Sequence, residues 1–118
     1  MLYYRETVIF GSYFETFYLT LPTKEQDKIL WTLRAIRTLR VVPNIYLKAI
    51  INSSGLYEVR SRVGTNTSRV FCFYADERTL IICNGFKKKS QRIPRKEIEK
   101  AERIKSIYYE SIDPTRTT

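Results

Sequence analysis

Three short segments rich in β-branched and aromatic residues follow one another closely in the second half of this 118-residue chain. They span residues 56–63, 69–75 and 80–86, and their composition is typical of β-strands. The breaks between them, residues 64–68 and 76–79, are polar and short enough for hairpin connections. This spacing predicts an antiparallel meander of three strands, against which the other elements must pack.

The first half of the chain carries the patterns of one strand and two helices. Residues 3–10 are β-branched and aromatic, which predicts a strand, and residues 13–21 fit a short helix. Thr23 and Gln26 match a capping box, in which both side chains satisfy free amides of the first turn, so a longer helix is predicted from there to about Val41. Its apolar positions recur at helical spacing and are Ile29, Leu30, Leu33 and Ile36.

The order of elements predicts an α+β fold. Residues 44–55 are interpreted as a connection. Pro94 is expected at the first position of a last helix. Residues 113–118 are interpreted as a frayed tail. No internal repeat or linker interrupts the chain, so residues 1–118 are expected to form one domain. In it, an N-terminal strand and two helices pack on an antiparallel meander sheet that a C-terminal helix follows.

The charge balance and the absence of histidine limit the possible functions. The chain has 21 Lys and Arg against 12 Asp and Glu, a net charge of +9, and no histidine. Such an excess favours association with a polyanion such as nucleic acid. Histidine-dependent hydrolases, His-ligated zinc enzymes and ribonucleases with a histidine acid–base pair are excluded. Two cysteines are too few to hold zinc unaided, so no metal and no cofactor are expected.

The sequence predicts a cytoplasmic protein with no membrane partner. No apolar run approaches the roughly 18 residues of a membrane span, and the first residues lack the basic-then-apolar order of a signal peptide. Cys72 and Cys83 are therefore expected to be reduced, buried thiols. They would face each other if the hairpin paired Ala75 with Leu80.

Basic residues gather on the predicted meander and directly after it. Strand alternation places Glu58, Arg60 and Arg62 on one face, and Arg69 lies near Arg62 across the ladder. A solvated, charge-balanced strand face and a solvated loop would also explain these charges. Because the meander delivers them to neighbouring positions, we expect instead one concave basic surface suited to a phosphodiester backbone. The loop contributes Lys87, Lys88, Lys89, Arg92, Arg95 and Lys96.

Two motifs in this region, with a short string between them, resemble those of a known superfamily. G-L-Y-E-V-R at residues 55–60, Arg69-Val70-Phe71, and N-G-F-K-K-K-S-Q-R-I-P at residues 84–94 occur in the order and spacing of the RelE/ParE toxins. The likeness covers about residues 3–110 and is strongest to the HigB-like, phage-derived branch. It implies a small RelE-like domain.

The resemblance implies the toxin of a type II toxin–antitoxin system. Such toxins are ribosome-dependent mRNA endonucleases that inhibit translation, so the implied partners are the ribosome, mRNA and a cognate antitoxin. The antitoxin often carries a helix-turn-helix domain and forms a hetero-oligomer with the toxin. Two alternatives stay open: a ParE-like inhibitor of DNA gyrase and a non-catalytic nucleic-acid-binding module.

Matching by motif carries the superfamily's catalytic positions to Arg60, Arg69, Lys87 and Lys88. The implied reaction is metal-independent attack of a ribose 2′-OH on the adjacent phosphate, giving a cyclic phosphate. Arginines would stabilise the phosphorane. A lysine of lowered pKa, or a group of the ribosome or the RNA, would move the proton. The chain lacks the histidine that some HigB-type members place in the site, and a tyrosine after the lysines. The expected RNA-binding residues are Arg62, Lys89, Gln91, Arg92, Arg95 and Lys96.

Overall fold

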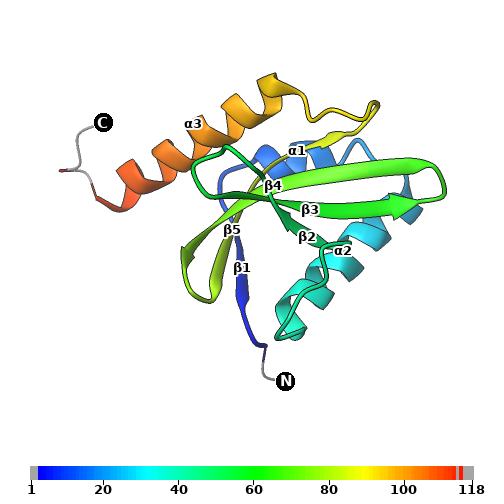
Figure 1. Ribbon diagram of the computed structural model, residues 1–118, viewed down its shortest axis with the longest axis horizontal. Coiled ribbons are helices and arrows are strands. Elements are labelled where there is room, and N and C mark those ends of the chain that lie inside the picture. The colour runs from blue at the N-terminus through cyan, green and yellow to red at the C-terminus, as the bar shows by residue number, and fades with distance from the viewer. Residues whose placement is uncertain (1–2, 114, 116–118) are drawn as a thin grey trace.

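A computed structural model describes residues 3–113 and 115 and shows a five-stranded sheet flanked by three helices (Figure 1). The sheet order is β1-β5-β4-β3-β2; β1 pairs parallel with β5, and the other pairs are antiparallel. The predicted α+β class is confirmed. The strands are β1 (Glu6–Ile9), β2 (Leu47–Ala49), β3 (Leu56–Val63), β4 (Asn66–Asp76) and β5 (Thr79–Lys87). The helices are α1 (Tyr13–Tyr18), α2 (Thr23–Thr38) and α3 (Arg95–Ile112).

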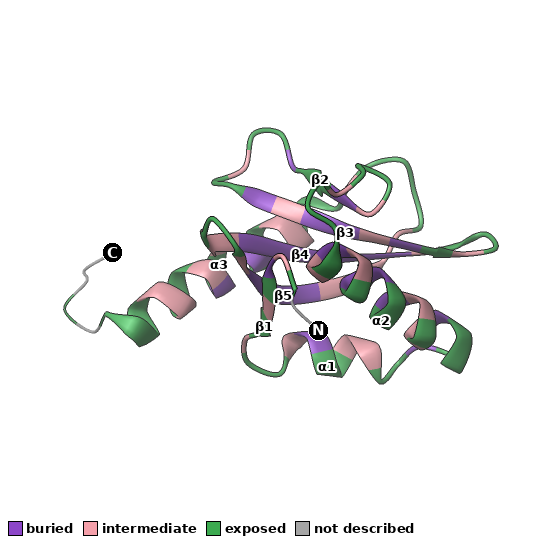
Figure 2. Cartoon of the chain, turned by 90° about the horizontal axis from the view of Figure 1, so that it is seen from below, coloured by how far each residue is buried: buried purple, intermediate pink, exposed green. Residues whose placement is uncertain are grey.

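The helices cover opposite faces of the sheet, so the protein has a core on each side. Figure 1 shows α3 above the strands and α2 below them, and Figure 2 shows buried residues concentrated in the central strands. The core on the α1 and α2 side includes Phe14, Ile29, Ile36, Val59, Val70, Cys72 and Ile82. The core on the α3 side includes Leu56, Phe71, Phe73, Ile81, Cys83, Phe86 and Ile104.

Strand β3 has the predicted bounds, but β4 and β5 extend further than predicted. The register shifts between Tyr74 and Asp76, so Cys72 pairs with Ile82, and it shifts back between Val70 and Cys72. At this second shift, Cys83 and Asn84 of β5 together oppose Phe71, which is the pattern of a β-bulge. The prediction that the two thiols face each other is therefore wrong, and they lie in different cores. Both are buried free cysteines, as predicted.

Strand β2 lies within residues 44–55, which the sequence pattern had placed in a connection. Its three residues pair with β3 from Tyr57 to Val59, and they are too few to show a strand period. Beyond Val59, the edge of β3 has no strand beside it among the described residues. This open edge is where the candidate site lies.

Helix α2 begins and ends differently from the prediction. Its N-cap is Pro22, without a side-chain cap bond, and the Gln26 amide instead donates to the Tyr18 carbonyl. The predicted capping box is therefore wrong. The helix ends at Thr38, and the buried Arg5 side chain donates hydrogen bonds to three carbonyls at this end, those of Ile36, Leu39 and Arg40.

The last helix starts within one residue of the prediction, because Pro94 is the N-cap of α3 and not its first residue. It ends at Ile112, immediately before the predicted frayed tail. Of that tail, residues 114 and 116–118 lie outside the described residues. Within the described part of the chain, no helix is long and apolar enough to cross a membrane.

Candidate nucleic-acid interface

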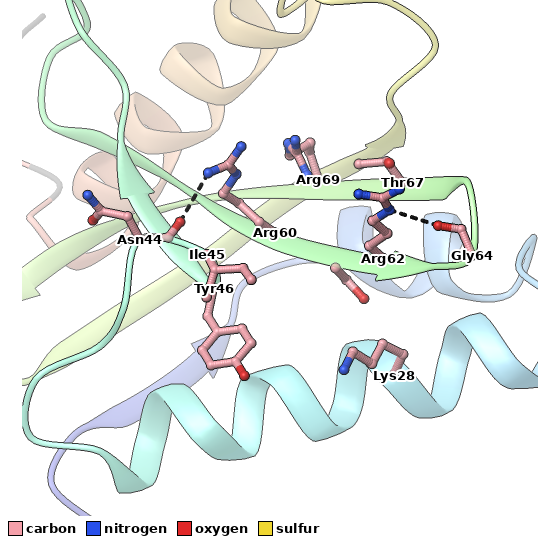
Figure 3. Close-up of a pocket in the computed structure, with 10 residues that line it drawn as sticks. Lys28, Asn44, Ile45, Tyr46, Arg60, Arg62, Gly64, Thr67 and Arg69 are labelled. Atoms are coloured by element: carbon pink, nitrogen blue, oxygen red, sulfur yellow. Dashed lines mark hydrogen bonds between the residues drawn. The ribbon is translucent and has the colours of Figure 1, made fainter.

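A pocket of about 670 Å³ lies at the open edge of β3, between the β3–β4 hairpin and α2 (Figure 3). One wall is the end of the hairpin, and the other consists of the loop before β2 and one residue of α2. Of the described residues that line it, four are basic and none is acidic. The basic residues are Lys28, Arg60, Arg62 and Arg69, and the remaining walls include Asn44, Ile45, Tyr46 and Thr67.

Arg60 and Arg69 are direct cross-strand partners, so they lie on the same face of the sheet. Glu58, two residues before Arg60 on β3, lies on that face too. Its carboxylate contacts both guanidinium groups: Oε1 lies 3.5 Å from Arg60 Nε, and Oε2 lies 3.4 Å from Arg69 Nε. The Glu58 carboxylate thus lies between the two arginines and contacts both. The sequence pattern identified both arginines but not this role of Glu58.

The cluster is deeply buried for a group of three charges. Side-chain exposure is 7% for Glu58, 7% for Arg69 and 30% for Arg60. Burial lowers the pKa of Arg69 from its ordinary value, the nearby Arg60 charge lowers it further, and Glu58 opposes both. Because a guanidinium keeps its charge even so, Glu58 serves to hold two like charges side by side.

The contacts of Glu58 leave most donors of the two arginines available. Each ion pair runs through Nε, and Arg60 Nη1 also donates to the Asn44 carbonyl at 3.1 Å. A guanidinium has five N–H donors arranged to meet two oxygens of a phosphate at once. The remaining donors of Arg60 and Arg69 can therefore bind an anion in the pocket.

Arg62 and Lys88 extend the basic face toward the hairpin turn. Arg62 pairs with Thr67 across the ladder, is exposed, and donates from Nε to the Gly64 carbonyl at 2.7 Å. The Lys88 amide donates to the Thr67 carbonyl at 2.9 Å, so the β4–β5 ladder continues one residue beyond β5. By this register Lys88 belongs to the face of Arg62 and Arg69. The structure thus brings Arg60, Arg62 and Arg69 together around one pocket, with Lys88 beside them.

Lys87 lies on the opposite face of the sheet. It pairs with Ser68, whereas Arg69 pairs with Phe86, and alternation turns the two basic side chains to different sides. Its ammonium lies 2.6 Å from Oε1 of the buried Glu25, in the first turn of α2. The expectation that Lys87 shares one basic surface with the arginines is therefore wrong. Its catalytic role stays a prediction.

The other predicted RNA-binding residues lie outside the pocket. Lys89, Gln91 and Arg92 are exposed in the loop after β5, and Arg95 and Lys96 are exposed in the first turn of α3. Arg95 forms a surface ion pair with Glu99, which is worth little in solvent. These five residues form a second, solvated basic region that starts where the ladder ends at Lys88.

The N-G-F part of the second motif has a structural explanation. The Asn84 amide donates to the Glu97 carbonyl and carboxylate in the first turn of α3. A Cβ on Gly85 would overlap the ring of Phe17 from α1, and Phe86 packs edge-on against Phe71 at 5.1 Å. These three residues fix both helix layers to β5, so they position the basic residues that follow.

Seven pocket residues were not predicted as site residues, and four of them lie outside the β3–β4 hairpin: Lys28, Asn44, Ile45 and Tyr46. Lys28 lies off the apolar stripe of its helix, and the other three lie in the segment interpreted as a connection. Their only sequence signal is an apolar pair, Ile45-Tyr46, in a loop after Pro43. No periodicity marks such a pair as part of a site.

The arrangement suits anion binding. In the described part of the chain, no three Asp, Glu or Cys side chains gather as a metal site would require. The α+β fold and the cationic pocket at the sheet edge define a small basic protein whose site suits a phosphate-bearing ligand.

A comparison of this chain with known protein families identifies the family to which it belongs. The profile of the family described as phage derived protein Gp49-like (DUF891) matches residues 17–106. Because this is more than half of the chain, the chain belongs to the Gp49-like family, a family of RelE/ParE-like toxins associated with toxin–antitoxin systems. The family implies an antitoxin partner. The match does not single out the HigB-like branch, and no curated protein matches the chain.

Proposed function

We propose that this protein is the toxin of a type II toxin–antitoxin pair and that it cleaves mRNA on the ribosome. The observation that carries the proposal is the pair Arg60 and Arg69, aligned by the buried Glu58 in the wall of a pocket. Two aligned guanidinium groups suit the oxygens of a phosphodiester, and their charge is most useful where the phosphorane gains negative charge.

In the proposed reaction the ribose 2′-oxygen attacks the adjacent phosphorus and the bond from phosphorus to the 5′-oxygen breaks. The 2′-proton goes to a base, and the leaving 5′-oxygen takes up a proton. Arg60 and Arg69 stabilise the phosphorane. We assign the proton donor to Lys88, because it shares their face by register, while a group of the ribosome or of the RNA accepts the first proton. The products are a cyclic phosphate and a 5′-hydroxyl.

The pocket favours this function over the two alternatives. A ParE-like inhibitor acts on gyrase through protein contacts and has no need of arginines aligned by a buried carboxylate. A plain nucleic-acid-binding module needs exposed cations for the phosphate backbone, and the loop after β5 would suffice for that. A cytoplasmic location and a helix-turn-helix antitoxin belong to the same proposal.

Mapping the 5′ ends of transcripts after induced expression tests the proposal. We expect new 5′-hydroxyl ends within translated regions, in phase with codons, and none in cells that express Arg69→Ala at the same level. DNA damage with intact mRNA would instead support the gyrase inhibitor. Growth inhibition equal for the wild type and Arg69→Ala would contradict the proposed site.

A further inference from the structure

The wall of the pocket opposite Arg62 and Arg69 is apolar and aromatic. Its apolar part is Ile45 and Tyr46, which precede β2, and Asn44 and Lys28 lie beside them. The Arg60 amide donates to the Tyr46 carbonyl at 2.8 Å, so Tyr46 is fixed beside the first of the two arginines. In Figure 3 the Tyr46 ring lies between the hairpin and α2.

A second aromatic residue supports Tyr46 from the helix. The Trp31 ring of α2 packs edge-on against the Tyr46 ring with 5.5 Å between centroids, and the Lys28 ammonium lies 4.2 Å from the centroid of Trp31. Trp31 is 48% exposed and Ile45 is 67% exposed, whereas Tyr46 is partly buried and packs against the core on the α2 side. This aromatic cluster therefore lies at the edge of that core, where it reaches the surface. A large exposed apolar group beside a cationic wall indicates a binding surface.

The two walls match the two chemical parts of a nucleotide. The arginines suit its phosphate, and a fixed aromatic ring suits the face of its base, because stacking on an aromatic side chain tolerates any base. The volume of about 670 Å³ also falls within the range of about 300–1,000 Å³ that is usual for small-ligand sites.

We propose that Tyr46 is the stacking platform for the base of a single-stranded RNA nucleotide whose phosphate is held by Arg60 and Arg69. This inference rests on the proposed function and extends it from a phosphate site to a nucleotide site. Trp31 holds the Tyr46 ring in place, and the ring, not the hydroxyl, makes the contact. Since a ring does not distinguish bases by hydrogen bonds, this subsite contributes affinity and not sequence preference.

The test measures binding of a labelled, uncleavable 2′-O-methyl RNA trinucleotide by fluorescence anisotropy, beside the same trinucleotide with an abasic central position. Trp31 is the only tryptophan of the chain, so its emission reports ligand at this wall. We expect Tyr46→Leu to weaken binding of the complete trinucleotide about 10-fold and to leave abasic binding unchanged. Tyr46→Phe should bind both as the wild type does.

Tyr3→Leu is the control, since Tyr3 is another tyrosine with an exposed ring and a basic neighbour, the Arg37 guanidinium 3.9 Å from its centroid, but it does not line the pocket. The proposal is overturned if Tyr46→Leu binds the complete trinucleotide as tightly as the wild type or loses both ligands equally. The proposal is also overturned if the wild type binds neither the complete nor the abasic trinucleotide. Cleavage of mRNA by wild-type protein on ribosomes is measured separately. Base-dependent binding without cleavage would contradict the proposed function alone.

Discussion

Two buried glutamates near the same end of the sheet each contact basic residues, but on opposite faces of the sheet and with different consequences. Glu58 lies on the α3 side and contacts the Nε atoms of Arg60 and Arg69, whose remaining donors can bind a ligand in the pocket. Glu25 lies on the α2 side and contacts the ammonium of Lys87, the only charged group of that lysine. In our proposal the first contact aligns two charges for a ligand, whereas the second joins α2 to β5 through an ion pair.

The difference shows that basic residues at neighbouring motif positions can lie on opposite faces of the sheet. Arg69 and Lys87 both stand in motif positions, and both lie next to a buried carboxylate. They differ in their face of the sheet, which the β4–β5 register determines. They also differ in chemistry, because a guanidinium can serve a carboxylate and a phosphate together.

The largest expected effect is the loss of activity when an arginine that contacts Glu58 is replaced. Arg69→Met removes a cation expected to stabilise the phosphorane, and we expect the cleavage rate on programmed ribosomes to fall about 100-fold or more. Arg69→Lys should recover little, because a lysine cannot replace the bidentate contact. A rate within about 3-fold of the wild type, from folded Arg69→Met, would contradict this role.

A smaller effect on activity and a clear loss of stability are expected for Glu58→Gln. This change leaves two neighbouring guanidinium groups without their shared carboxylate, which costs about 3 kcal/mol in the free energy of unfolding. Urea denaturation measures that loss. The double variant Glu58→Gln, Arg69→Met should recover part of it, because one buried charge is no longer left beside another. No recovery would show that Glu58 acts independently of Arg69.

The ion pair between Lys87 and Glu25 is expected to contribute to stability and little to activity. Lys87→Met should lower the free energy of unfolding by about 1–2 kcal/mol, because it leaves the Glu25 carboxylate unpaired; Lys87 itself is 36% exposed. Cleavage should stay within about 3-fold of the wild type. A folded Lys87→Met variant with a large loss of activity would instead support the catalytic role predicted from the motif.

The smallest effect is expected in the exposed basic region after β5, away from the Glu58 and Glu25 ion pairs. Lys96→Ala should weaken RNA binding only a few-fold and reduce the slope of log affinity against log salt by about 1, as loss of one phosphate contact does. Lys100→Ala, one turn further along α3, is the matched control and should change neither quantity. Equal effects of the two variants would indicate general charge attraction without a defined contact.

Much of the fold could be predicted from local signals. Residues 56–63 form a strand with the expected ends, and α1 and α3 start within one residue of their expected positions. Strand alternation, turn residues and helix-terminal prolines act over a few neighbours, so the sequence shows them directly. In the site, the same alternation correctly placed Glu58, Arg60 and Arg62 on one face.

The remaining features depend on contacts between distant segments. A register shift between Tyr74 and Asp76, which the sequence pattern does not show, separated Cys72 from Cys83. A second shift, between Val70 and Cys72, restored the original register, so Lys87 pairs with Ser68 and turns away from Arg69. The Glu25 contact with Lys87 and the aromatic wall at Tyr46 each join residues far apart in the chain.

The sequence alone determined the element types, the meander and the excess of positive charge, because periodicity, turn chemistry and composition are local or additive properties. Only the tertiary structure decided which of these charges face the pocket and which lie on the opposite face of the sheet. The physical reason is that a shift of one residue in strand register moves a side chain to the other face of the sheet.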